Sequence, residues 1–584
     1  MINNKFKKGL VLAMILLFIG TSFIPSTVGI IDKKITVTTF GSRGYIQGLI
    51  DNASDGDTIY IPSGIYYENI DINKSISLIG EDKNTTIIHG IEFKSVINIF
   101  ADWVNISGFT IRNGTGYPYY YNAGVGLSSD NNTITGNIIL NNSYGIFLFH
   151  SGYNNNISEN IISNNLWGIY LKFSNGNIIT GNNIANNENA GIFLEYSSNT
   201  TVTGNMMVND GIVISGFDLE DWNTYSIDTS NTVNGKPIIY WKNKIGGEIT
   251  TSVGQVILAN CTEVVVKNQT INYCSVGIQL GFSSNCTIIS NEIFSNLRNG
   301  VYLCASSSNI IINNNINLNK EDCILFVGSS DNNTITINNI SNNNKGIGLV
   351  DSSDNIILDN NITNNNWVGI GGQSCRNNII KSNNIINNGG FGITLVYNIN
   401  NIITSNNIIN NEGNSGISLM NCRNNSITSN NITNNKNNGI RIYWSSDNIV
   451  IGNNILNNLK GLTIEFASNN NTIYHNNFIN NTDNALGYHL SDNIWDDGKY
   501  GNFWSDYKEK YPDAKKKIFK GIWDTPYEIE GGDNQDNYPL IRQWSKTRTR
   551  TITRNIVSFN SLFQWFLEQF PLLQKLIQQQ WFKQ

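Results

Sequence analysis

A repeat of 23 residues runs through most of this chain and constrains its fold more than any other feature. It begins at Ser128, and the stretches that start at Ser151 and Ser174 repeat its order of Asn, Ile and Gly. The pattern resumes at Asn260 and continues through the unit that starts at Ser468, which makes about fourteen units. One such unit cannot bury its own apolar face, so the repeat predicts a solenoid in which each unit packs on the next.

Each unit contains three short segments in which apolar and polar residues alternate, which indicates strands rather than helices. Gly recurs at the eighteenth position, as in Gly145 and Gly168, and precedes an Ile-x-Leu type strand. Leucine-rich repeats have similar lengths, but their L-x-x-L-x-L run is absent. We therefore expect an all-β fold, a right-handed parallel β-helix with three sheets, an N-terminal cap and a C-terminal aromatic module.

Asn occupies the fourteenth position of most units. Its side chain tolerates the left-handed backbone region, so it can turn the corner between two strands. Coils stack at about 4.8 Å, which also lets each amide bond to the amide of the next coil. We expect a structural ladder formed by Asn141, Asn164, Asn187, Asn342, Asn365, Asn388, Asn411, Asn435 and Asn458.

Breaks in the repeat divide the chain. Residues 46–90 contain a segment that can form a short helix over the first coil, and residues 221–259 interrupt the period as an insertion. The predicted parts are 1–30, signal peptide or N-terminal anchor; 31–127, cap and irregular coils; 128–220, coils; 221–259, insertion; 260–491, coils; 492–541, aromatic and acidic module; and 542–584, basic linker and amphipathic helical tail.

The two ends of the chain indicate where it works. Lys5, Lys7 and Lys8 precede an apolar run that ends at Ile19, which is the order of an export signal; an uncleaved membrane anchor is the alternative. Both place the body outside the cytoplasm. Residues 556–584 have apolar positions at helical spacing after a basic linker, so we expect contact with a membrane surface, or else a helix folded back on the rod.

Charge and cysteine content narrow the possibilities further. The net charge is -6 and Lys and Arg are scattered, which excludes a nucleic-acid partner of the usual kind. Seven cysteines lie between Cys261 and Cys422 without a CxxC motif, and an odd number does not make a disulfide framework. We expect them to be buried packing residues.

Several phrases outside the repeat are more specific than the coils. They are ADWVNISGFTIRNG from Ala101, GKPIIYW in the insertion, and WDDGKYGNFWSDY and GGDNQDNYPL near the C-terminus. Together with residues 46–90 they resemble archaeal surface proteins of the NosD-like family over about residues 35–542. That family is related to pectate-lyase-like β-helices and is often described as carrying a carbohydrate-binding or sugar-hydrolysing domain. The resemblance implies the fold and an extracytoplasmic location, and it implies chemistry only loosely.

Metal chemistry has few candidate ligands. The family name suggests copper, which needs clustered His, Met or Cys, yet the four histidines are His89, His150, His475 and His489, of which only the last two share a coil. We expect no cofactor, with Ca²⁺ as the alternative. Asp331 and Asp354 are the candidate ligands, because we place them at the same position of adjacent coils, about 4.8 Å apart; turn capping is the competing interpretation.

The sequence also lacks the motifs expected of a polysaccharide-cleaving enzyme. A hydrolase similar to the polygalacturonases would show grouped Asp, a Gly-His-Gly and an Arg-Ile-Lys, whereas this chain has no Gly-His-Gly and reads Arg441-Ile442-Tyr443. A lyase would need a Ca²⁺-holding carboxylate cluster beside a basic residue.

Glycan binding needs aromatic faces beside polar groups. The stretch from Trp495 to Tyr538 is the densest aromatic and acidic block of the chain, although its rings could instead cap the solenoid. The candidate ligand-binding residues are Trp495, Trp504, Tyr507, Trp523, Tyr527, Tyr538, Trp222 and Trp241.

These observations favour an exported or cell-surface β-helix protein that binds glycans without cleaving them, or that serves in adhesion or structure. Its partner would be an extracellular glycan or a component of the cell envelope. A polysaccharide lyase or glycoside hydrolase is the first alternative, and a NosD-like factor for copper-site or other metal-site maturation is the second.

Overall fold

The computed structural model describes residues 44–91, 93–114, 122–150, 152–488, 492–531 and 534–545. Almost all of their regular structure is β-strand, and the helices among them are α2 (Tyr45–Asn52), α3 (Glu220–Asn223) and α4 (Tyr507–Lys510). The predicted all-β parallel β-helix is thus confirmed. Some sequence predictions concern residues that the structure does not describe, namely 1–30, 556–584 and His489.

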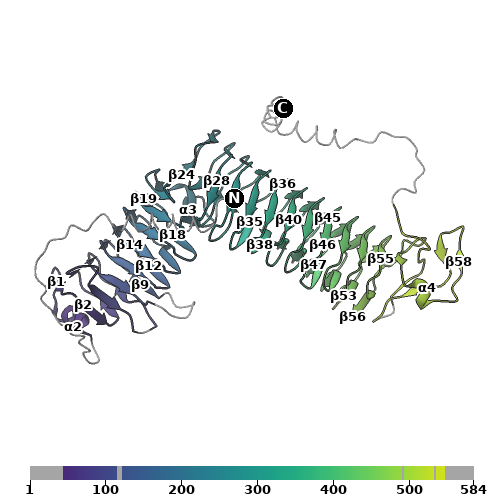
Figure 1. Cartoon of the computed structure of the whole chain (residues 1–584), viewed down its shortest axis with the longest axis horizontal. Helices are drawn as coiled ribbons and strands as arrows, with labels where there is room; N and C mark the ends of the chain where they lie inside the picture. Colours follow the sequence, from purple (N-terminus) through teal and green to yellow (C-terminus); the bar gives the residue numbers. More distant parts are fainter. Residues whose placement is uncertain are drawn as a thin grey trace, which may run out of the picture.

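The strands form three parallel sheets in each of two consecutive arms (Figure 1). In the N-terminal arm the first sheet runs from β1 (Thr58–Ile61) to β22 (Ser226–Ile227), and the second from β2 (Gly64–Tyr67) to β23 (Thr232–Val233). The third sheet contains β3 (Ile70–Ile72), β6 (Ile97–Ile99), β9 (Ala123–Leu127), β12 (Tyr144–Phe149), β15 (Trp167–Lys172), β18 (Ala190–Glu195) and β21 (Ile212–Ser215).

The C-terminal arm repeats this arrangement. Its first sheet runs from β25 (Glu248–Ile249) to β54 (Thr472–Tyr474), and its second from β28 (Thr270–Asn272) to β57 (Phe503–Trp504). The third sheet contains β24 (Lys236–Lys242), β26 (Gln255–Ala259), β29 (Ile278–Gly281), β32 (Val301–Cys304), β35 (Asp322–Val327), β38 (Lys345–Val350), β41 (Ile370–Gln373), β44 (Ile393–Val396), β47 (Ser415–Met420), β50 (Asn438–Tyr443), β53 (Lys460–Glu465) and β56 (Asp483–Tyr488).

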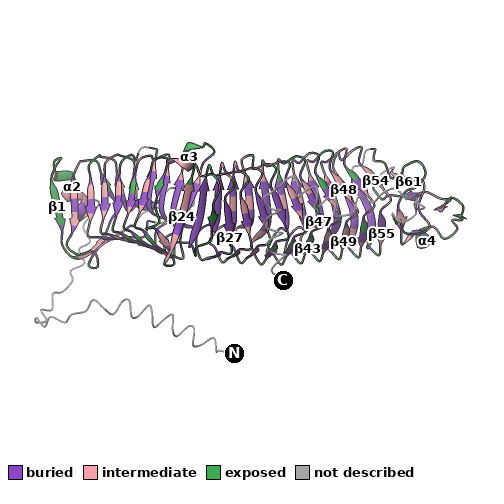
Figure 2. Cartoon of the chain, turned by 90° about the horizontal axis from the view of Figure 1, so that it is seen from above, coloured by how far each residue is buried: buried purple, intermediate pink, exposed green. Residues whose placement is uncertain are grey.

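The first sheets have eight and eleven strands, which correspond to about 19 turns, more than the fourteen regular repeats because the N-terminal coils are irregular in sequence. The central residue of most short strands points into the coil, as with Ile335, Ile357 and Ile380, which are at most 1 % exposed. Figure 2 shows the buried strands along the length of the rod. Burial of each such side chain stabilises the fold by about 1.5–3 kcal/mol, so the repeat supplies one continuous core.

Asn ladders run beside this core. In one of them the backbone N–H and Nδ2 of Asn360 both donate to Oδ1 of Asn383, at 2.9 and 3.0 Å. Of the predicted ladder residues, six are buried and hydrogen-bonded in this way: Asn187, Asn365, Asn388, Asn411, Asn435 and Asn458.

The other three predicted ladder residues lie one position too early. Asn141, Asn164 and Asn342 are exposed corner residues with φ of 55–57°, and the ladder amides belong to the residues that follow them, Asn142, Asn165 and Asn343. The two roles assigned to one Asn are therefore divided between neighbours. The first adopts the left-handed backbone and the second turns its amide inward.

The two arms meet at a bend, with the third sheets on its concave side (Figure 1). The predicted insertion at residues 221–259 builds the junction of the arms: it holds most of α3, the last strands of the N-terminal arm and the antiparallel β23–β24 hairpin that starts the other arm. Among the described residues β21 is the last strand of its sheet, and side chains bond to its outer edge. Gln255 and Gln279 both donate to the carbonyl oxygen of Ile212 at 2.7 Å.

Both ends of the coil are covered. At the start, Ile46 and Ile50 of α2 are fully buried, and the carboxylate of Glu68 accepts the N–H groups of Ile46 and Gln47. At the other end, the ring of Trp504 stacks between those of Phe478 and Tyr527, with centroid distances of 4.5 and 4.1 Å. These caps close the core where stacking ends.

Candidate functional site

The predicted glycan-binding aromatics of the C-terminal module are buried. Trp495, Trp504, Tyr507, Trp523 and Tyr527 are at most 6 % exposed, so their faces are covered by one another and by the last coil. Trp504 also donates from Nε1 to Asp536, a carboxyl whose pKa burial raises to about 7. The prediction that these rings form a sugar-binding surface is wrong, and the capping alternative describes them.

The remaining three aromatic candidates have separate environments. Trp222 is fully buried and fits against Gly281, where a Cβ atom would lie 1.9 Å from its ring. Trp241 is half-buried, with the ammonium of Lys244 3.3 Å from a ring centroid. Tyr538 is also half-buried, and its backbone N–H donates to Asp536. The structure does not bring these residues together into one site.

The two candidate calcium ligands do not occupy equivalent positions. The ladder residues Asn333 and Asn355 are paired, which makes Asp331 equivalent to Ser353 and Asp354 equivalent to Asn332. Asp331 accepts the N–H of Ser353 at 2.6 Å, and Asp354 accepts Nδ2 of Asn377 at 3.0 Å. The prediction that Asp331 and Asp354 are equivalent is wrong because the spacing between the ladder residues Asn333 and Asn355 is 22 residues, one fewer than the 23-residue period. Both carboxylates therefore bond to the following coil, Asp331 at a backbone N–H and Asp354 at a side-chain amide.

A different aromatic surface lies on the third sheet of the N-terminal arm. Phe147, Tyr170, Phe193 and Val213 are in register on its outer side and form a second apolar cluster apart from the core. Tyr144 and Trp167 flank this column, with stacked rings 6.5 Å apart. An apolar column on the outside of a coil needs a cover or a ligand.

The C-terminal arm supplies part of that cover at the bend. The guanidinium of Arg298 lies 5.4 Å from the ring centroid of Trp167 and 5.8 Å from that of Phe193, which is cation–π geometry. Arg298 also pairs with Glu321 at 3.3 Å. Burial raises the pKa of Glu321, although Arg298 opposes this effect.

A second ion pair joins the starts of the neighbouring strands β35 and β38. Lys345 lies 3.4 Å from Asp322, and its ammonium also faces the ring of Trp367, which is 55 % exposed. Burial raises the pKa of Asp322, and Lys345 opposes that rise. Charged side chains and the ring of Trp367 therefore lie along the edge where the third-sheet strands of the C-terminal arm begin.

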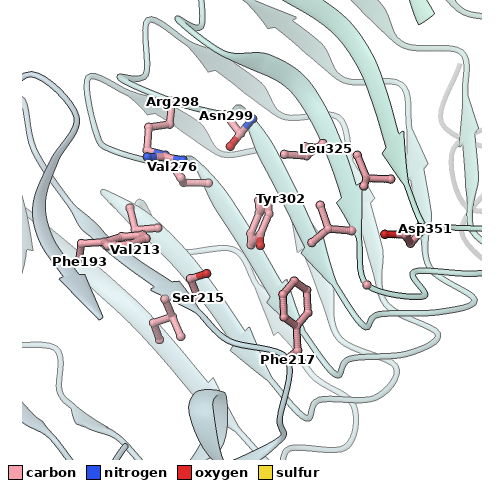
Figure 3. A pocket seen from close by; sticks show the side chains of 14 residues that line it. Phe193, Val213, Ser215, Phe217, Val276, Arg298, Asn299, Tyr302, Leu325 and Asp351 are labelled. Atoms are coloured by element: carbon pink, nitrogen blue, oxygen red, sulfur yellow. The ribbon is translucent and has the colours of Figure 1, made fainter. Parts of the chain in front are cut away.

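A pocket of about 250 Å³ lies between the arms (Figure 3). Ser215 and Phe217 border one side, Arg298 and Asn299 another, and Tyr302 lies between them. Phe217 is 59 % exposed and packs against Gly328, which leaves room for its ring. Since ligand pockets usually measure about 300–1,000 Å³, this volume suits one small unit of a longer ligand.

Exposed and half-exposed aromatic rings lie along the opposite edge of the third sheets, where the strands end, in both arms. Each follows directly after a third-sheet strand and has φ between 43 and 58°. They are Phe173, Tyr196, Phe282, Tyr397, Trp444 and Phe466. We name these six residues the corner row. A bulky residue at positive φ is strained, by about 1–3 kcal/mol, and such strain is concentrated at functional sites.

Neither the corner row nor the bend pocket was among the sites predicted from the sequence. A signal for the row was present, because an aromatic residue recurs immediately after the third strand of several repeats. The pocket has no such signal, since its residues come from two arms whose meeting depends on the irregular segment between them.

Comparison with models of protein families identifies the family of this chain. The model described as "Periplasmic copper-binding protein (NosD)" matches residues 50–226, 209–389 and 365–509. The chain belongs to the NosD family. This confirms the predicted resemblance and agrees with a location outside the cytoplasm.

Copper ligands do not fit the described part of this NosD-family chain. All seven thiols are buried one by one along the coils, and burial raises the pKa of Cys286 to about 12. His89 and His475 belong to opposite ends of the rod, and His150 is a corner residue of the N-terminal arm. No group of three or more His, Cys, Asp or Glu that could hold a metal occurs among the residues described.

Solved structures similar to this NosD-family chain include polysaccharide-modifying enzymes. The periplasmic alginate epimerase AlgG has 12 % identity and a TM-score of 0.26, covering 68 % of this chain and 82 % of its own. An alginate lyase from Paenibacillus sp. str. FPU-7 has 13 % identity, a TM-score of 0.27 and coverages of 50 % and 91 %. The A-module of the Azotobacter vinelandii mannuronan C-5 epimerase AlgE4 has 13 % identity and a TM-score of 0.23, covering 66 % of this chain and 89 % of its own. These values carry no information about this chain's ligand.

The comparison with curated protein sequences gave no match. Across the described ranges, no helix is both long and apolar enough to cross a membrane.

Proposed function

We propose that this NosD-family protein is exported and binds a glycan chain without cleaving it, along the concave side of its bent rod. The observation that carries the proposal is the combination of the bend pocket with the corner row on one edge of the same sheets. Sugar rings stack their C–H faces on aromatic rings, while hydroxyl groups bond to amides, carboxylates and guanidinium groups.

The corner row suits a ligand that runs parallel to the rod. Neighbouring coils are about 4.8 Å apart, and Trp444 and Phe466 belong to neighbouring coils, with ring centroids 5.9 Å apart. The pocket adds polar groups, namely Arg298, Asn299 and Asp351, at the point where the arms meet. Because Trp444, Phe466 and Asp351 each follow directly after a strand, binding would require little reordering of their backbone.

The test is retention on immobilised polysaccharides and glycan arrays, beside assays for reducing ends and unsaturated products. The variant Trp444→Asn with Phe466→Asn removes two rings while placing Asn, which favours positive φ, at both corners. Loss of two stacking contacts of about 0.5–1.5 kcal/mol each predicts a roughly fivefold to 150-fold weaker affinity with no loss of stability.

Trp103→Asn is the matched control, because Trp103 is 70 % exposed and has φ of 62° but lies at a different corner, before the first sheet. Equal loss of affinity in this control, or no retention by any glycan, would contradict the proposal. Released product would favour the catalytic alternative, for which the partly buried carboxyls of Glu321 and Asp322 beside Arg298 and Lys345 are the residues to substitute.

A further inference from the structure

The C-terminal end of the rod carries a basic hairpin with an apolar tip. Strands β58 (Lys516–Lys517) and β59 (Ile522–Trp523) pair antiparallel, and β58 lies at the far end of the molecule in Figure 1. We name residues 515–521, with the sequence KKKIFKG, the basic hairpin. It contains four lysines and no acid, so its local charge is opposite to that of the whole chain.

The tip of this hairpin is unusually exposed for apolar side chains. Ile518 is 75 % exposed and Phe519 is fully exposed, at 107 % of its reference area. Lys515, Lys516, Lys517 and Lys520 are exposed around them. The ion pairs found among the described residues all lie elsewhere in the rod. Lys517 interacts electrostatically with Asp524 and Lys516 lies 5.4 Å from the ring centroid of Trp523, but all four lysines face solvent and can approach a partner.

A cleft of about 780 Å³ lies beside the hairpin. Lys499, Lys516, Lys520 and Arg542 supply basic groups to its lining, and Tyr500 and Trp544 supply rings. Its opposite wall is fixed, because Trp544 stacks on His475 with centroids 3.5 Å apart. The backbone of Trp544 also bonds to the amide of Asn477 in both directions, at 2.6 and 3.0 Å.

These features together match the chemistry of a phospholipid surface. Exposed apolar side chains surrounded by lysines bind where acyl chains meet anionic headgroups, since the rings enter the interface and the charges stay with the phosphates. A soluble polyanion would use the lysines but would leave Ile518 and Phe519 in water. The paired exposure of both kinds of side chain therefore favours a bilayer.

We propose that the basic hairpin docks the C-terminal end of the rod on an anionic lipid bilayer, with Ile518 and Phe519 in the interface and a lipid headgroup in the adjacent cleft. This surface is separate from the concave face and does not depend on glycan binding. It holds the rod by its end, which leaves the concave face clear of the membrane.

The first experiment reports where the tip lies. The full chain with Phe519→Cys is labelled with an environment-sensitive fluorophore, which reacts selectively because the seven native thiols are buried. Vesicles containing equal parts of phosphatidylglycerol and phosphatidylcholine are expected to shift the emission to the blue, and vesicles of phosphatidylcholine alone are not. Ile245→Cys, at a residue 81 % exposed beside the bend, is the matched control and should show no shift.

The second experiment measures partition by vesicle flotation. Each basic residue near an anionic surface contributes about fivefold to binding, so the triple variant Lys515→Gln, Lys517→Gln and Lys520→Gln should lose about 100-fold. The same three substitutions should abolish the fluorescence shift at position 519.

Three results would overturn the proposal. Vesicle binding with a water-like emission at position 519 would assign the contact to residues 546–584. A blue emission without vesicles would mean that the chain's own tail or a second copy covers the tip. Equal binding to vesicles of phosphatidylcholine alone would remove the role of the lysines.

Discussion

The side chain of Gln279 donates from Nε2 to the carbonyl oxygen of Ile212 at 2.7 Å, which joins the two arms of the rod through a buried amide. Its Oε1 accepts the N–H of Ile214 at 3.1 Å. Ile212 and Ile214 belong to β21, the last strand of its sheet among the residues that the structure describes. The glutamine thus gives the N–H of Ile214 an acceptor that this buried group would otherwise lack, and it shares the carbonyl oxygen of Ile212 with Gln255.

Replacing this amide should loosen the bend locally. We expect Gln279→Leu to leave the N–H of Ile214 unsatisfied, at a cost of about 1–3 kcal/mol. Amide hydrogen exchange in peptides that contain residues 212–215 should become roughly fivefold to 150-fold faster. Gln373→Leu is the control, because Gln373 is an exposed residue of β41 in the same sheet. Equal acceleration in both variants would refute this account.

Stability should depend on pH through Asp210. It ends a ladder, accepting the N–H and Nδ2 of Asn187 on one oxygen, while its other oxygen, Oδ1, has no partner among the described residues. Burial raises its pKa to about 8 from an ordinary value of 3.8. The folded state therefore holds a proton that the unfolded chain releases, so stability falls as pH rises from about 4 to 8.

Asp210→Asn should remove the contribution of Asp210 to this dependence, since Asn is the usual ladder residue. The buried carboxyl of Asp536, whose pKa is raised to about 7, contributes equally in both proteins. At pH 8 the variant should be more stable than the parent by a few kcal/mol, and the difference should shrink towards zero near pH 4. Chemical denaturation at several pH values measures it. Glu188→Gln, a substitution at an exposed carboxylate in the neighbouring coil, should leave the pH profile unchanged; the same change in profile there would rule out Asp210 as its source.

Replacing a buried ladder Asn should lower the stability of the fold much more than replacing the exposed Asn beside it. Asn360 accepts both the N–H and Nδ2 of Asn338 and donates to Asn383. Asn360→Ala leaves buried donors without an acceptor and should cost at least about 2 kcal/mol in urea unfolding. Asn361→Ala removes only an exposed bond to Asn339, so it should cost under about 1 kcal/mol. Similar costs would contradict an energetic role for the ladder.

The repeat made the β-helix predictable because only stacked strands can bury a 23-residue unit of this pattern. The finer register was not predictable in the same way. Consecutive Asn residues, such as Asn141 and Asn142, differ in backbone conformation rather than in chemistry, and spacings of 22 to 24 residues shift positions such as Asp331 and Asp354 out of equivalence.

The candidate site was less predictable still. The same aromatic composition can cap a core or bind a sugar, and the difference lies in whether a ring such as Trp504 meets Tyr527 or solvent. The bend pocket depends on long-range contacts, including that of Arg298 with Trp167, which no local pattern encodes. The corner row is the exception, because its periodic position was visible in the repeat.

The cysteines provide a last test, because several occupy ladder positions. The N–H groups of Cys261 and Cys422 donate to the hydroxyl oxygens of Ser283 and Ser445, and that of Cys286 donates to Oδ1 of Asn309. Burial raises the pKa of Cys375 and Cys422 to about 11. The thiolate is the reactive form, so the native protein at pH 8 should react negligibly with a thiol reagent.

Full reaction of seven thiols is expected only after unfolding in guanidinium chloride, which serves as the internal control. The Phe519→Cys variant should react at one site under native conditions, because Phe519 is fully exposed. Rapid native labelling of any of the seven would mean that a coil opens locally and that its cysteine does more than fill the ladder. Labelling confined to residue 519 would instead show that the stack stays closed along the coils that carry the cysteines.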